Sequence, residues 1–180
     1  MNDTLGRKIT YLRLSMTDLC DLRCIYCMPE HGVPKRAHSE ICSLEELCDM
    51  AAAAVSLGVC IMGGEPLVRR GVVSLCRMLR ALPALEELGL TTNGVRLPEL
   101  AAPLREAGVD RLNISLDTLR PERYRRITRI GELSSVLRGL DAAEAAGFSH
   151  TKLNCVLMGG VNDDEIEDFV RLTQARPLSV

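Results

Sequence analysis

The sequence predicts an α/β fold in which parallel β-strands alternate with α-helices. Segments typical of strands and of helices follow one another five times along the 180 residues, which is the pattern of β-α-β units. Polar and glycine-rich groups follow four of the predicted strands, where parallel α/β folds carry their chemistry. This order fits either a doubly wound sheet or a barrel. Since no linker or low-complexity segment divides the chain, we expect one domain.

Each element is predicted from a local pattern. Strands are expected where short apolar or alternating segments occur, at residues 8–15, 59–62, 88–92, 111–116 and 152–158. Helices are expected from apolar spacing and end signals, at residues 44–57, 70–82, 98–108, 134–146 and 163–173. Ser43 and Glu46 form a capping box before the first helix, and Gly58 is expected to stop it. Asn162 or Asp163 is expected to cap the last helix.

The predicted sheet is incomplete. Residues 177–180 end the chain where a sixth strand should begin, so we expect an α/β sheet truncated before the sixth strand. A complete parallel barrel has eight strands, and five cannot close one.

Composition excludes several classes of protein. The formal net charge of −2 argues against broad nucleic-acid binding, which needs a basic surface. No apolar run approaches the roughly 18–20 residues that span a bilayer, so no membrane association is expected. Residues 1–4 lack a signal-peptide pattern, and we expect a cytoplasmic protein. Its eight cysteines then indicate metal or redox chemistry, because a reducing cytosol disfavours disulfides.

Three of these cysteines form a tight cluster. Cys20, Cys24 and Cys27 are spaced C-x3-C-x2-C on a polar loop after the first strand, and three thiolates can hold one soft-metal centre. A structural zinc site would need a fourth ligand. An iron–sulfur cube on three cysteines would leave one iron open for chemistry. The nearby candidates for a fourth zinc ligand are His31, His38 and Cys42.

Two motifs together resemble the radical S-adenosylmethionine (SAM) enzymes. One is C-x3-C-x2-C with Tyr26 before its last cysteine, and the other is the Gly-Gly-Glu-Pro turn at residues 63–66. The resemblance implies a [4Fe–4S] cluster held by Cys20, Cys24 and Cys27, with the amino-acid end of SAM on the fourth iron. It also implies an incomplete (βα) barrel of the radical SAM type. The implied contacts of SAM are Tyr26, Gly64 and Ser115, with Glu65 near its ammonium group.

A narrower resemblance is to the GTP 3',8-cyclase family of molybdenum-cofactor (molybdopterin) biosynthesis. It rests on segments at residues 5–7, 11–15, 27–30, 89–94, 113–117, 152–154 and 160–165. It implies a lyase that converts GTP to (8S)-3',8-cyclo-7,8-dihydroguanosine 5'-triphosphate through a 5'-deoxyadenosyl radical, with an electron donor as partner. Arg13, Thr91 and Lys152 would contact GTP, which suits a triphosphate because Arg and Lys are its usual donors.

The chain departs from this family in two respects. Only residues 59–62 separate Gly58 from Gly63, about three fewer than the family has, and the phosphate-binding arginine expected there is absent. The resemblance covers residues 1–180 as a partial radical SAM core domain, without the C-terminal half that carries a second three-cysteine cluster. A homodimer or a complementing C-terminal half is therefore a candidate partner. Two alternatives stay open, namely a radical SAM protein with another substrate and an inactive fragment with a structural metal.

Overall fold

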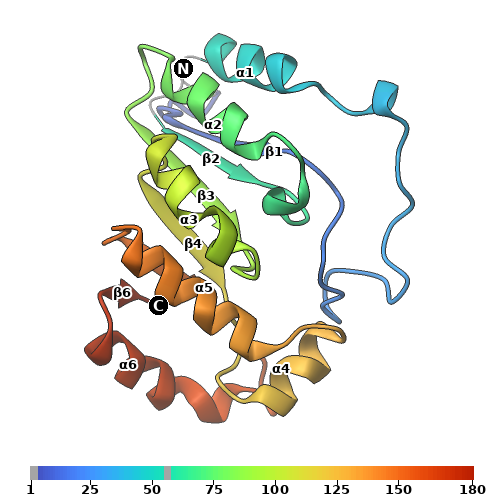
Figure 1. The fold of residues 1–180 in the computed structure, drawn as a ribbon, viewed down its shortest axis with the longest axis vertical. Coiled ribbons are helices and arrows are strands. Elements are labelled where there is room, and N and C mark those ends of the chain that lie inside the picture. The colour runs from blue at the N-terminus through green and yellow to red at the C-terminus, as the bar shows by residue number, and fades with distance from the viewer. Residues whose placement is uncertain (1–3, 55–57) are drawn as a thin grey trace.

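The computed structural model describes residues 4–54 and 58–180, which alternate between strands and helices along the chain (Figure 1). The strands are β1 (Tyr11–Ser15), β2 (Gly58–Met62), β3 (Glu87–Thr92), β4 (Arg111–Ser115), β5 (Thr151–Asn154) and β6 (Leu178–Ser179). The helices are α1 (Leu44–Ala53), α2 (Val72–Arg80), α3 (Leu97–Glu106), α4 (Pro121–Thr128), α5 (Leu133–Ala145) and α6 (Ile166–Ala175). Three short 3-10 helices are η1 (His38–Glu40), η2 (Pro66–Val68) and η3 (Asp163–Glu165).

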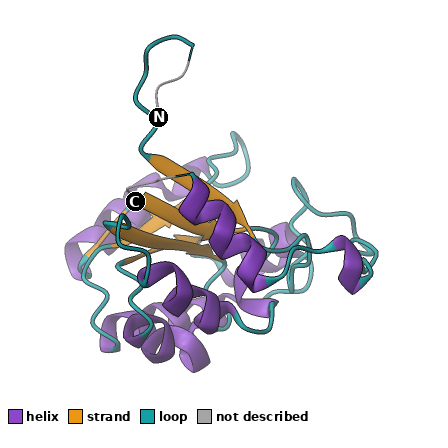
Figure 2. Cartoon of the chain, turned by 90° about the horizontal axis from the view of Figure 1, so that it is seen from above, coloured by secondary structure: helices purple, strands orange, loops and turns teal. Residues whose placement is uncertain are grey.

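The six strands form one parallel sheet in the order β1-β2-β3-β4-β5-β6. Every strand pairs with the next strand in the chain. A doubly wound sheet reverses its strand order at a switch point, whereas a barrel does not. The sequential order therefore identifies a part-barrel, and within the described residues β1 and β6 are its two edges. Figure 2 shows the helices packed along this sheet.

The register gives the sheet two different faces. Paired residues on neighbouring strands point to the same side, and successive residues along a strand alternate. The helix-covered face is aliphatic and makes up much of the core, with Leu14, Val59, Ile61, Leu88, Leu90, Leu112, Ile114 and Leu153. The opposite face, here called the polar face, carries Tyr11, Arg13, Ser15, Cys60, Glu87, Thr91, Arg111, Asn113, Ser115, Lys152 and Asn154. A ligand inside the part-barrel would meet this polar face.

The prediction that the chain stops before a sixth strand was wrong. Leu178 and Ser179 pair with Thr151 and Lys152 as the short strand β6. Arg176 precedes a proline, which disfavours helical backbone, and its extended conformation turns the chain from α6 toward the sheet edge.

Three predicted element ends also differ from the structure. Gly58 does not stop a helix but begins β2, where its missing side chain leaves room for the Tyr11 ring. The last helical turn expected before it includes residues 55–57, which lie outside the described residues. The fifth strand ends at Asn154, before residue 158, because the Val156 amide donates to the Asp117 carboxylate at 2.9 Å. Asn162 does not cap α6, since its side chain donates to the carbonyl groups of Asp117 and Val156.

Helix α4 was not predicted from the sequence. It has Pro121 at its start, where proline is tolerated, and four arginine or glutamate residues among its eight. Only Tyr124, Ile127 and Thr128 are buried in it, which is too few apolar positions to give a clear helical period.

Among residues 4–54 and 58–180, no helix combines the length and the apolar character that crossing a lipid bilayer requires.

Candidate functional site

The loops that follow the carboxyl ends of β1 to β4 are joined by direct contacts. They are the cysteine loop (residues 16–29), the Gly63–Pro66 turn, the Thr92–Gly94 turn and the Ser115–Asp117 segment. This meeting of loops at one end of the sheet is the place predicted for the site.

The two glycines of the Gly63–Pro66 turn let it pack directly on the cysteine loop. The Gly64 amide donates to the Thr17 carbonyl at 2.6 Å, and the Glu65 amide donates to the Leu19 carbonyl at 2.8 Å. Gly63 has a φ of +150°, and a Cβ atom there would lie 2.5 Å from the Thr17 oxygen. A Cβ atom on Gly64 would lie 2.7 Å from the Asp18 oxygen. Both positions therefore need glycine for backbone packing alone.

Glu65 connects this turn to the turn after β3. Its side chain is buried, with 1% exposed, and one carboxylate oxygen accepts from the Leu67 amide at 2.9 Å and the Thr92 hydroxyl at 2.7 Å. The other oxygen accepts from the Asn93 amide at 2.6 Å. Burial raises the pKa of Glu65 to about 7, although these three donors favour its charged form. The carboxylate thus holds two site loops in one arrangement.

Asn93 extends the connection to the cysteine loop. Its side-chain amide donates to the Asp21 carboxylate at 2.6 Å, next to Cys20. Residues 91–94 were expected among the polar groups at the strand ends, but the contact of Asn93 with Asp21 was not predicted. The signal for it is the position of an amide side chain at the carboxyl end of a parallel strand.

The three cysteines share one loop whose backbone turns back on itself. The amides of Cys27 and Met28 donate to the Cys24 carbonyl, at 3.1 and 2.9 Å. Burial raises the pKa of Cys24 to about 12, and the neighbouring Cys27, Asp117 and Cys20 raise it further. In residues 4–54 and 58–180, no three side chains of His, Cys, Asp or Glu are grouped as ligands of one metal ion.

Tyr26 is tied to the segment after β4. Its hydroxyl donates to one oxygen of Asp117 at 2.6 Å, and the Val156 amide donates to the other at 2.9 Å. The backbone carbonyl of Asp117 accepts from the Asn162 side chain at 2.6 Å. Asp117 therefore fixes the orientation of Tyr26 relative to β4 and β5.

Helix α4 and the turn after it hold the cysteine loop from the other side. The amides of Arg23 and Ile25 donate to the carbonyls of Thr128 and Ile127, at 3.0 and 2.9 Å. The guanidinium of Arg129 donates to the carbonyls of Arg23 and Met28, at 2.7 and 3.1 Å. Figure 1 shows the N-terminal blue segment running down to meet α4. These contacts with the cysteine loop were not predicted from the sequence, because α4 itself was not predicted.

The polar face carries a row of contacts across the strands. The Thr91 hydroxyl lies 3.4 Å from the Cys60 sulfur and accepts from the Asn113 side chain at 3.3 Å. Arg111 donates to the Asn113 side chain at 3.0 Å and to the Tyr11 hydroxyl at 2.7 Å. Arg111 also pairs with Glu87. Four residues predicted to contact ligands lie on this face, namely Arg13, Thr91, Ser115 and Lys152.

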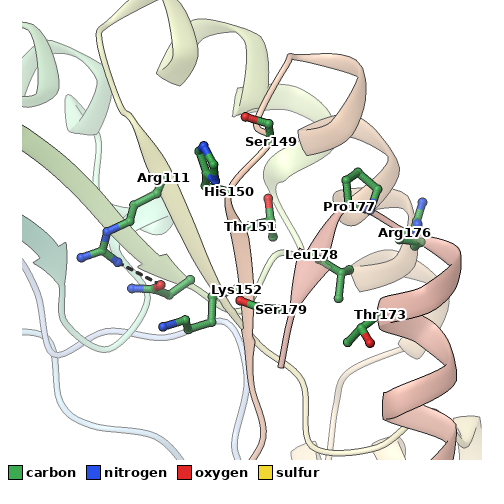
Figure 3. A pocket seen from close by; sticks show the side chains of 11 residues that line it. Arg111, Ser149, His150, Thr151, Lys152, Thr173, Arg176, Pro177, Leu178 and Ser179 are labelled. Atoms are coloured by element: carbon green, nitrogen blue, oxygen red, sulfur yellow. Dashed lines mark hydrogen bonds between the residues drawn. The ribbon is translucent and has the colours of Figure 1, made fainter.

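A cavity of about 520 Å³ opens at the amino ends of β4, β5 and β6 (Figure 3). Arg111 and Lys152 line it from one side, and Thr173, Arg176 and Pro177 line it from the other. Lys152 is the one predicted ligand-binding residue among the lining residues. The cavity therefore lies at the opposite end of the strands from the cysteine loop.

Comparison with known proteins finds a matching family model, similar curated proteins and similar solved structures. A family model described as "Radical SAM superfamily" matches residues 14–173. The GTP 3',8-cyclase of Geobacter sulfurreducens is 58% identical over 181 residues, which cover 99% of this chain and 56% of the relative. The GTP 3',8-cyclase of Peptoclostridium acidaminophilum is 54% identical over the same shares of the two chains. The chain thus spans about half the length of the curated relatives it matches.

A solved structure supports the fold. The structure of native anSMEcpe with bound AdoMet has a TM-score of 0.72 and 18% identity, and the match covers 96% of this chain and 51% of that one. At this identity the likeness concerns the fold alone, and it confirms the predicted incomplete barrel of the radical SAM type. Because the family model spans most of the sequence, the chain belongs to the Radical SAM superfamily.

Proposed function

We propose that residues 1–180 are the radical SAM core domain of a GTP 3',8-cyclase. The observation that carries this proposal is the joining of the three-cysteine loop to the Gly63–Pro66 turn at the carboxyl ends of the sheet. It occurs in a chain that is 58% identical to a protein named GTP 3',8-cyclase. The activity would convert GTP to the 3',8-cyclo triphosphate in molybdenum-cofactor biosynthesis.

Membership in the superfamily implies an iron–sulfur cluster and SAM as cofactors. We assign Cys20, Cys24 and Cys27 as ligands of a [4Fe–4S] cluster. The residues present fit that group, because three free thiols, which are soft donors, lie on one loop that packs against the turn at residues 63–66. When reduced, such a cluster supplies the electron that cleaves the sulfonium of bound SAM.

The contacts assigned to SAM are Tyr26, Gly64, Glu65 and Ser115. Gly64 and Tyr26 are exposed beside the cysteines, and Ser115 ends β4 on the polar face. Glu65 already accepts three hydrogen bonds, and a carboxylate has about four acceptor sites. One site is left for the ammonium group of SAM, while the other three hold the surrounding loops in position.

The contacts assigned to GTP are Arg13, Thr91 and Lys152. Arg13 and Lys152 are exposed on the polar face, where two cations can engage a triphosphate. Thr91 lies between them on β3 and presents a hydroxyl. These residues bind and orient the substrate along the polar face of the sheet.

One observation favours a second candidate, a radical SAM protein with another substrate. The residues of β2 that share the polar face are Gly58, Cys60 and Met62, and none of them carries a positive charge. A phosphate group opposite β2 would thus lack the arginine that the family resemblance implies. The cytoplasmic location, the electron donor and a homodimer or complementing half remain predictions.

The test is 5'-deoxyadenosine formation from SAM after anaerobic cluster reconstitution and reduction with dithionite. We expect product from the wild-type chain, a GTP-dependent increase in its rate, and loss of product in Cys24→Ala. If 5'-deoxyadenosine forms at a rate that GTP does not change, the second candidate is supported. A chain that binds one zinc ion and no sulfide would refute the proposal, since the site would then be a structural metal site.

A further inference from the structure

The Tyr124 hydroxyl is a buried polar group that has no hydrogen-bond partner in the described part of the chain. The residue is 3% exposed and lies in the middle of α4. The hydroxyl groups of the other two tyrosines do have partners, since Tyr11 bonds Arg111 and Tyr26 bonds Asp117. A buried hydroxyl without a partner is destabilising, so its presence points to an acceptor that protein atoms do not supply.

The hydroxyl end of the Tyr124 ring lies against the cysteine loop. A Cβ atom on Gly131 would be 2.8 Å from Cε1 of Tyr124, which adjoins the hydroxyl-bearing carbon, and 2.8 Å from Cδ2 of Leu22. Leu22 lies between Cys20 and Cys24 in the loop. One turn beyond Tyr124, the carbonyls of Ile127 and Thr128 accept from Ile25 and Arg23.

The neighbouring carboxylates bond to other donors, since Asp21 accepts from Asn93 and Asp117 accepts from Tyr26 and Val156. The Tyr124 ring adjoins Leu22, which lies between Cys20 and Cys24. A group held by these cysteines would therefore be a neighbour of the hydroxyl end of the ring. Burial raises the pKa of Tyr124, and Cys24, Asp21, Asp117 and Cys20 raise it further.

We propose that Tyr124 donates a hydrogen bond to a sulfur atom of the iron–sulfur centre that Cys20, Cys24 and Cys27 hold. This inference rests on the cluster assignment in the proposed function and adds a residue outside its motifs. A donor aimed at a cluster sulfur stabilises the reduced centre more than the oxidised one, because reduction adds negative charge. Tyr124 would therefore raise the reduction potential of the cluster, so that a weaker external reductant could reduce it.

The test compares Tyr124→Phe with the wild-type chain and with Tyr11→Phe as a matched control at the base of β1. After anaerobic reconstitution, each protein is titrated with a reductant and its midpoint potential is measured by the signal of the reduced cluster. We expect a more negative potential in Tyr124→Phe at unchanged iron and sulfide content, and no shift in Tyr11→Phe. We also expect the reduced wild-type cluster to show coupling to an exchangeable proton that Tyr124→Phe lacks.

A measurement on the metal-free chain separates this role from a structural one. Phenylalanine keeps the ring and removes the unpartnered hydroxyl, so the melting temperature of metal-free Tyr124→Phe should not fall below that of the wild type. An intact cluster with an unchanged potential and unchanged proton coupling would overturn the inference while leaving the proposed function standing. A wild-type chain that assembles no iron–sulfur cluster would overturn both.

Discussion

At the scale of single residues, the site depends on how closely two backbones approach. Gly64 can be tested because its missing Cβ atom leaves room for the carbonyl groups of Leu19 and Asp18, which are backbone atoms that cannot rotate away. We expect Gly64→Ala to lower the free energy of unfolding by about 1–3 kcal/mol. Gly159→Ala is the control, since nothing lies within 4 Å of its Cβ position, and it should change stability by less than about 0.5 kcal/mol.

Urea denaturation of the metal-free chain measures both variants. Equal stability of Gly64→Ala and Gly159→Ala would mean that the cysteine loop is not packed on the turn. Gly64 would then serve ligand contact only.

Glu65 gives a second prediction at this scale, in the pH dependence of stability. Its pKa is raised by burial from an ordinary value of 4.5 to about 7 in the folded chain. Its contribution to stability is therefore fully present below about pH 4.5 and is lost as the pH rises through about 7. The shift corresponds to about 3 kcal/mol. The unfolding free energy of the wild type relative to Glu65→Gln should accordingly fall between pH 5 and pH 8, and a constant difference would contradict the raised pKa.

At the scale of elements, α4 and the turn after it fasten the cysteine loop. Arg129 has a φ of +64°, which is unfavourable for any residue except glycine, and its guanidinium spans the carbonyls of Arg23 and Met28. The strained backbone is thus balanced by contacts with the loop on both sides of Cys24 and Cys27.

Two substitutions at Arg129 separate these effects. Arg129→Ala keeps the strain and loses the contacts, whereas Arg129→Gly loses both, so we expect the glycine variant to be more stable by about 1 kcal/mol. Hydrogen exchange of the amides of residues 23–28 should speed up in both variants. It should not change in Arg126→Ala, because Arg126 is exposed on α4. Unchanged exchange in Arg129→Ala would show that the backbone pairing alone holds the loop.

At the scale of the whole molecule, the alternation of strands and helices was sufficient to predict the fold class. The aliphatic segments around Ile61, Leu90 and Ile114 become the helix-covered face, and the polar residues between them become the opposite face. The register that brings Thr91, Asn113 and Lys152 side by side could not be predicted, because it depends on how neighbouring strands align. Helix α4 could not be predicted either, because its few buried residues form no apolar stripe. Its contacts are with the cysteine loop, which is far away in the sequence.

The candidate site also divides into features that a local sequence pattern predicts and contacts between distant segments that it does not. The motifs predict Cys20, Cys24 and Cys27 as ligands because their spacing is local. The connections through Asn93, Asp117 and Arg129 link segments far apart in the sequence, and no local pattern encodes them. These connections form only when the carboxyl ends of several strands come together.

The polar face as a whole makes the last prediction, which rests on the proposed function. Arg13 and Lys152 stand exposed on β1 and β5, so a triphosphate between them would lie across the polar face from β1 to β5. We expect Arg13→Ala and Lys152→Ala each to weaken GTP binding about tenfold or more, as expected for loss of a charge-assisted hydrogen bond. Calorimetric titration of the SAM-loaded chain measures this, and the effect should shrink at high salt. Arg138→Ala, an exposed cation on α5, should leave the affinity unchanged. If all three variants bind GTP equally well, the triphosphate does not bind on this face. The second candidate, a radical SAM protein with another substrate, would then be favoured.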